Sequence, residues 1–161
     1  MSEVDLEEQM DPSPTTVPNF ALHLIVDDVR SSIAWYEQAL GATVTRVLRL
    51  PDGTIATAEL DLHGVPLAMA AAVPGSTLAS PAVSGTSAAA YRLTVEDADA
   101  AMARALAVGA TVSEEVRDEF WGVRTGEVLD PSGHRWAFDE QLRQVPIEEV
   151  ESRLADLLEG H

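Results

Sequence analysis

The sequence contains no cysteine among its 161 residues. Disulfide bonds, a thiolate nucleophile and zinc held by cysteine are therefore excluded. The absence suits a reducing compartment, and we expect a cytoplasmic protein. Long apolar runs are also missing, and none approaches the length of a membrane span. The N-terminus is acidic and lacks the basic start and apolar stretch that are typical of a signal peptide.

Basic residues are scarce: ten Lys and Arg stand against 27 Asp and Glu, which gives a formal net charge of −17. Such a surface repels nucleic-acid phosphates and anionic lipids, so we expect neither nucleic acid nor a membrane as a partner. Part of the acidity lies in residues 1–17, which we predict to be a disordered lead-in. The hydrophobic content of 46% is enough for one compact domain or two small packed ones.

An internal repeat is the strongest feature of the sequence. Three pairs of segments recur in the same order: LIVDD at 24–28 with LTVED at 93–97, GATV at 41–44 with GATV at 109–112, and LDLHG at 60–64 with LDPSG at 129–133. Their offsets are 69, 68 and 69 residues (93 − 24, 109 − 41 and 129 − 60). A colinear series at nearly one offset indicates two copies of one structural unit.

Each copy predicts a strand, a helix and three further strands. The strands are expected at 21–26, 43–50, 53–62 and 65–72 in the first copy, and at 91–95, 111–118, 123–130 and 134–138 in the second. Between the first two strands, an acidic pair begins a helical pattern and a glycine, Gly41 or Gly109, ends it. Helical spacing assigns Tyr36 and Leu106 to the buried helix faces.

These elements predict an α+β fold of two βαβββ modules, at 18–72 and 87–139, joined by a linker at 73–86. The remaining residues, 140–161, contain an amphipathic helix that follows Pro146. We expect that helix to pack on the body of the protein or on a second subunit.

The paired repeat resembles the vicinal oxygen chelate superfamily, which includes glyoxalase I, bleomycin-resistance proteins, fosfomycin-resistance enzymes and extradiol dioxygenases. The resemblance covers roughly residues 19–140. The PhnB-like branch is the most similar, because of two motifs and a C-terminal PIEEVESRL segment: Trp121-Gly122-x-Arg124 and Asp130-Pro131-x-Gly133-His134-x-Trp136. The resemblance implies that each module curls its mixed sheet into half of a cup, and that paired cups hold a ligand on their concave faces.

The resemblance also implies metal positions on the first and last strand of each module. In the family, the last-strand position lies four residues after the Asp-Pro-x-Gly glycine, which gives Ala137 and, by the repeat offset, Ala68. The first-strand position lies five residues before the valine that precedes the acidic pair, which gives Ala21 and Ala90. Alanine carries no lone-pair donor for a metal. A register slip of two residues would substitute His23, Ala70, Arg92 and Asp139, and arginine is not a metal ligand. We therefore expect no metal and no other cofactor.

Strand alternation selects the side chains that would line the cup. If the four alanines face the cup, His23, Thr94 and the two arginines Arg92 and Arg135 face it as well. The arginines have two interpretations: they hold a carboxylate or phosphate of the ligand, or they pair with Asp139.

Trp121 and Arg124 belong to the hairpin that precedes the strand at 123–130. In one interpretation this pair stacks on a planar ligand. In the other, Trp121 closes a dimer or packs against Trp136.

The leading hypothesis is a metal-independent small-molecule-binding protein of the glyoxalase/bleomycin-resistance type, used for drug sequestration or as a carrier. The alternative is a glyoxalase-like lyase or isomerase, or a dioxygenase, with non-standard or no metal ligands. That enzyme would need an acid–base group, for which His23 is the candidate because histidine titrates near neutral pH. A third possibility is a structural or regulatory dimer with a vestigial cup. The expected partners are a small organic molecule and a second copy of the chain in a homodimer.

Overall fold

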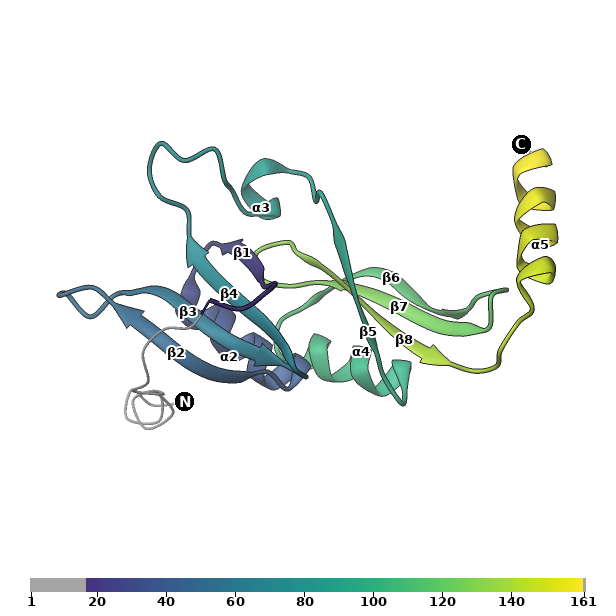
Figure 1. The fold of residues 1–161 in the computed structure, drawn as a ribbon, viewed down its shortest axis with the longest axis horizontal. Helices are drawn as coiled ribbons and strands as arrows, with labels where there is room; N and C mark the ends of the chain where they lie inside the picture. Colours follow the sequence, from purple (N-terminus) through teal and green to yellow (C-terminus); the bar gives the residue numbers. More distant parts are fainter. Residues whose placement is uncertain (1–16, 161) are drawn as a thin grey trace.

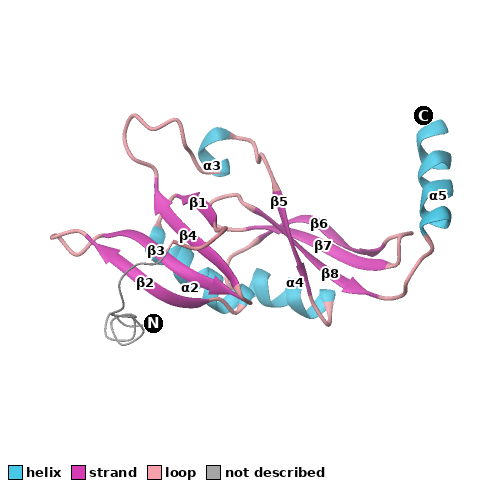
Figure 2. Ribbon diagram, in the orientation of Figure 1, coloured by secondary structure: helices cyan, strands magenta, loops and turns pink. Residues whose placement is uncertain are grey.

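The structure is a computed structural model that describes residues 17–160. The strands and helices form two modules with the same order of elements (Figures 1 and 2). The first module contains β1 (Leu22–Val26), α2 (Val29–Leu40), β2 (Thr43–Arg49), β3 (Ile55–Leu62) and β4 (Val65–Ala71). The second contains β5 (Ala90–Thr94), α4 (Ala98–Ala107), β6 (Thr111–Asp118), β7 (Val123–Leu129) and β8 (Arg135–Gln141). The short helix α3 (Pro81–Ser84) interrupts the linker, and α5 (Ile147–Glu159) follows the second module.

Each module builds one four-stranded mixed sheet. The strand orders are β1-β4-β3-β2 and β5-β8-β7-β6, which are equivalent in the two copies. The first and last strand of each module pair in parallel, and the other neighbours are antiparallel. The α+β fold of two βαβββ modules with a C-terminal helix is therefore confirmed.

The acidic pairs begin the helices as expected. Asp28 accepts a hydrogen bond from the Ser31 backbone N–H at 2.7 Å, and Asp97 accepts one from Ala100 at 2.9 Å. A carboxylate at this position satisfies a backbone donor that the first helical turn leaves free. Gly41 ends α2 with φ = 71°, whereas α4 ends at Val108, one residue before the glycine that the sequence suggested.

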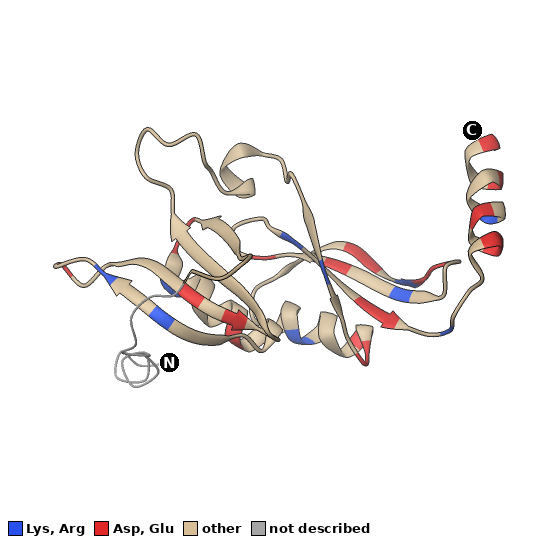
Figure 3. Cartoon of the chain, in the orientation of Figure 1, with Lys and Arg blue, Asp and Glu red and all other residues tan. Residues whose placement is uncertain are grey.

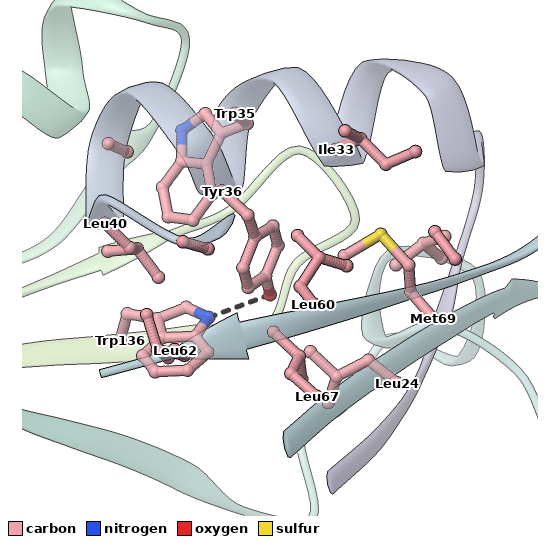
Figure 4. Close-up of a cluster of buried hydrophobic side chains, with 14 of the residues drawn as sticks. Leu24, Ile33, Trp35, Tyr36, Leu40, Leu60, Leu62, Leu67, Met69 and Trp136 are labelled. Carbon is pink, nitrogen blue, oxygen red and sulfur yellow. Dashed lines mark hydrogen bonds between the residues drawn. The ribbon is translucent and has the colours of Figure 1, made fainter. Parts of the chain in front are cut away.

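One hydrophobic core joins the two modules. Helices α2 and α4 pack against each other, and the ring of Tyr36 on α2 lies 5.7 Å from Trp136 on β8 (Figure 4). Trp35 and Tyr36 are both buried. The prediction for Leu106 is wrong, because its side chain is 38% exposed and Ala105 supplies the buried contact instead.

The two ends of the chain differ in what the structure describes. The predicted disordered segment 1–17 lies outside the described residues, apart from the exposed Val17. At the other end, α5 stands apart from both sheets and buries none of its residues (Figure 1). Among the described residues, no helix is both long and apolar enough to cross a membrane.

Candidate functional site

Each sheet has one face against the helices and a second face that the helices leave free, here called the open face. On β1 and β4, the helix side carries the buried residues Leu24, Val26, Leu67 and Met69. The open face carries His23, which is exposed and registers with Ala68. Arg92 registers with Ala137 in the same way on the second sheet. The strand register expected from alternation is therefore right in both modules.

The four alanines implied as metal positions are spread over these faces. Ala68 lies between His23 and Glu59, and Ala137 lies between Arg92 and Glu127. Ala90 registers with Arg135, and Ala21 directly precedes β1. Methyl groups supply no ligand atom, so the residues at these positions do not fit a metal ion.

One acidic group among the described residues has a spacing that suits a metal: Asp97, Asp99 and Glu140. It lies at the start of α4, not on an open face. All three carboxylates already have partners. Asp97 accepts a hydrogen bond from the Ala100 backbone N–H, Asp99 pairs with Arg124, and Glu140 accepts a hydrogen bond from the Ala98 backbone N–H. We assign no function to it.

Arg92 lies on the open face of the second sheet and pairs with Asp139. Its Nε and Nη2 donate to the two carboxylate oxygens of Asp139 at 2.7 and 2.6 Å. Thr125 completes the cluster, since its hydroxyl donates to Asp139 at 2.6 Å and accepts from Arg92 at 3.2 Å. Pairing with Asp139 raises the pKa of Arg92. Of the two interpretations of Arg92, the geometry supports the internal pair.

Arg135 also has an internal partner, but not the one considered from the sequence. Its Nε donates to Glu127 Oε1 at 2.7 Å, and its Nη2 donates to Ser113 at 3.1 Å. Sequence reasoning missed Glu127, whose side chain is only 10% exposed. Alternation along β7 places Glu127 and Thr125 on one face, but only the register across to β8 shows that this is the open face.

The remaining predicted site residues do not gather in one place. Thr94 is exposed at the end of β5, opposite Asp139. Arg124 lies at the other face of β7, where it binds Asp99 on α4 and Asp118 on β6 at 2.7 Å each. These two hydrogen bonds hold the pKa of Arg124 well above its usual value.

Trp121 sits in the turn between β6 and β7 with 39% of its surface exposed, and its ring contacts Phe120 edge to face. The suggested packing of Trp121 against Trp136 is wrong. Trp136 instead packs against Tyr36 and Tyr91 in the core.

The open face of the first sheet contains a cavity of about 320 Å³. Its floor includes the small residues Ala21 and Ala68, and Thr45, Glu59 and Asp61 add polar groups. This volume suits a small organic molecule, and a mostly apolar floor with a few polar groups is the usual composition of a ligand site.

The fold and the open faces define a protein of the glyoxalase type. The family model of the glyoxalase/bleomycin resistance protein/dioxygenase superfamily matches residues 17–138, and the chain belongs to that superfamily.

Three similar proteins illustrate the range of the match. An uncharacterized protein of Mycobacterium bovis is 34% identical over 146 residues, which cover 89% of this chain and 96% of that protein. The X-ray structure of a gene product from Arabidopsis thaliana is 30% identical, with a TM-score of 0.63, and the match covers 78% of this chain and all of that one. The crystal structure of TioX from Micromonospora sp. ML1 is 25% identical, with a TM-score of 0.56 and the same coverage.

Proposed function

We propose that this protein binds a small organic molecule on its open faces without a metal, as a sequestering or carrier protein of the glyoxalase/bleomycin-resistance type. The observation that carries the proposal is the alanine at each implied metal position, because two of these alanines, Ala21 and Ala68, line the cavity on the first open face. The alanines remove the donors that metal-assisted chemistry needs. The same methyl groups leave room for a ligand above the sheet, most clearly at Ala68 in the cavity of about 320 Å³.

The two motifs at 121–124 and 130–136 support a place in the PhnB-like branch of the superfamily. A cytoplasmic location, expected from the absence of cysteine, also remains a prediction.

A homodimer is part of the proposal. Both open faces and most of the apolar side of α5 lie uncovered in the single chain. A second copy would cover these surfaces and convert open faces into enclosed ones, where polar contacts to a ligand are shielded from water.

Protein purified without chelator tests the absence of a metal. We expect elemental analysis to find no stoichiometric zinc, nickel, manganese or iron, and native mass spectrometry to detect any co-purified organic molecule. A stoichiometric metal that is lost in His23→Ala and retained in His63→Ala would refute the proposal. His63 is the matched control because its ring bonds to the Leu40 carbonyl away from the open face.

Filling the cavity tests the binding site. Ala68→Phe should abolish binding of a co-purified or screened ligand to the first sheet, because the ring would occupy the cavity floor. Ala71→Phe is the control, since Ala71 is exposed at the end of the same strand. Unchanged binding in Ala68→Phe would place the ligand elsewhere.

A further inference from the structure

The open faces carry arginines, which are the side chains that could bind an acidic group of a ligand. Strand register places four arginines there among the described strands: Arg46, Arg92, Arg117 and Arg135. Each arginine has a carboxylate partner within the chain. An arginine that already pairs with an internal carboxylate binds a ligand carboxylate or phosphate poorly. The ligand anion must displace the internal carboxylate or share the N–H donors of the arginine with it.

Arg92 and Arg135 form two of the three arginine pairs on the open face of the second sheet, and the third is formed by Arg117, whose side chain is 62% exposed. The Nε and Nη2 groups of Arg92 donate hydrogen bonds to both carboxylate oxygens of Asp139. Arg135 holds Glu127, whose nearly buried carboxylate would lose its partner if a ligand anion took the arginine. Leaving a buried charge unpaired is costly, so exchange with a ligand anion is unfavourable.

The first sheet repeats the arrangement more loosely. The Nε of Arg46 lies 3.6 Å from Glu59 Oε2. Glu59 and Asp61 are the charged residues that line the cavity, and no arginine lines it among the described residues. Across both open faces the register places five carboxylates against four arginines: Glu59, Asp61, Glu114, Glu127 and Asp139.

Resting on the proposed binding function, we propose that the open faces select an organic ligand without an acidic group and favour a cationic ligand over its neutral counterpart. The internal pairs exclude anions, and the excess of carboxylates attracts a cation. Asp139 is the residue that sets this selectivity on the second sheet, because it occupies the arginine edge that an anion would use.

Three matched naphthalene probes test the inference by calorimetric titration of the full chain: 2-naphthylmethylammonium, 2-naphthalenemethanol and 2-naphthoate. We expect the ammonium probe to bind most tightly, the alcohol less tightly, and naphthoate about tenfold more weakly than the ammonium probe. Adding the alcohol should displace the ammonium probe and naphthoate from the protein. Such displacement shows that the three probes share one site, whereas a cation held only by general attraction to an acidic protein would not be displaced.

Asp139→Asn should remove most of the selectivity against the anion on the second sheet, because it frees Arg92 while preserving the size of the side chain. We expect naphthoate to gain about five- to tenfold in affinity relative to the alcohol. Asp156→Asn on the remote α5 makes the same change in net charge and should leave all three affinities unchanged. Glu127→Gln is a second, independent test, because it removes the carboxylate that pairs with Arg135 and should also raise the affinity for naphthoate.

The outcomes separate the two proposals. Naphthoate binding as tightly as the ammonium probe, or no gain of naphthoate affinity in either released variant, overturns the charge selectivity and leaves the binding function standing. If none of the probes binds and no organic molecule co-purifies, the binding function fails, and the selectivity fails with it.

Discussion

At the residue scale, the Asp-Pro-x-Gly-His-x-Trp motif joins the two modules. One oxygen of Asp130 accepts the backbone N–H groups of Ser132 and His134 at 2.9 Å each, and the other accepts the Tyr36 hydroxyl at 2.7 Å. Trp136 Nε1 donates to the same hydroxyl at 3.0 Å (Figure 4), and His134 Nε2 lies 2.7 Å from the Ile25 carbonyl. The motif therefore serves the structure of the module junction, and its histidine is not on an open face.

Replacing Tyr36 with Phe should destabilise the protein at neutral pH by about 1–3 kcal/mol, because Asp130 and Trp136 each lose a buried hydrogen-bond partner. Urea unfolding at pH 7 measures the loss. A free energy of unfolding equal to that of the parent would show that the junction does not depend on this hydroxyl.

The same residue predicts an alkaline sensitivity. Burial, and then the neighbouring Asp130 carboxylate, raise the pKa of Tyr36 well above its usual value. The folded state therefore holds this proton more tightly than the unfolded chain, and the free energy of unfolding falls as pH rises beyond about 10. Tyr36→Phe should lose less stability than the parent between about pH 9 and about pH 11. Tyr91→Phe is the comparison variant, since partial burial raises the pKa of Tyr91 as well.

At the element scale, the turn between β6 and β7 anchors the segment that leads to α5. The Gly122 carbonyl accepts hydrogen bonds from the Leu142 and Arg143 backbones at 2.9 and 3.2 Å. A Cβ at Gly122 would lie 2.3 Å from the Arg143 carbonyl oxygen, and its φ of 87° already disfavours other residues. The Trp-Gly-x-Arg motif thus has a structural reason for its glycine.

Gly122→Ala should destabilise the protein by about 2–4 kcal/mol, which combines the cost of a left-handed alanine with the clash against the Arg143 backbone. Gly53→Ala measures the cost of the left-handed backbone alone, because Gly53 has φ = 85° and no atom lies within 4 Å of the added Cβ. Equal losses in the two variants, measured by urea unfolding, would show that the close approach at Gly122 costs nothing.

Helix α5 is an amphipathic element that covers nothing in its own chain. Its apolar side exposes four large residues: Ile147, Leu154, Leu157 and Leu158. Acidic residues dominate its polar side, where Arg153 is the one basic residue (Figure 3). A helix of this kind gains most of its stability from packing, so its apolar side indicates a contact beyond the chain itself.

At the scale of the whole molecule, we expect a homodimer that uses α5. Sedimentation velocity at micromolar concentration should give about twice the chain mass of 17.2 kDa. Leu154→Glu should shift the distribution to the monomer, because it places a charge within the buried interface. Ser152→Glu adds the same charge to the opposite side of the helix and should leave the dimer intact. A parent protein that sediments as a monomer would contradict the prediction.

Local patterns in the sequence determined most of the fold. The repeat, the acidic caps and the strand alternation placed two βαβββ modules, identified Tyr36 as a core residue, and assigned His23 and Arg92 to open faces. These features are readable because helix starts and strand alternation depend on residues within a few positions of one another. The linker helix α3 was not predicted, since four residues carry too little periodicity.

The tertiary structure alone decided the electrostatics of the candidate site. The sequence left Arg92 and Arg135 open to a ligand anion or to Asp139, and it did not suggest Glu127 as a partner. Their partners lie 47 and 8 residues away in sequence, and sheet register brings each pair together. An arginine's availability to a ligand depends on which carboxylate a neighbouring strand places within hydrogen-bond distance, and the register between paired strands sets that placement.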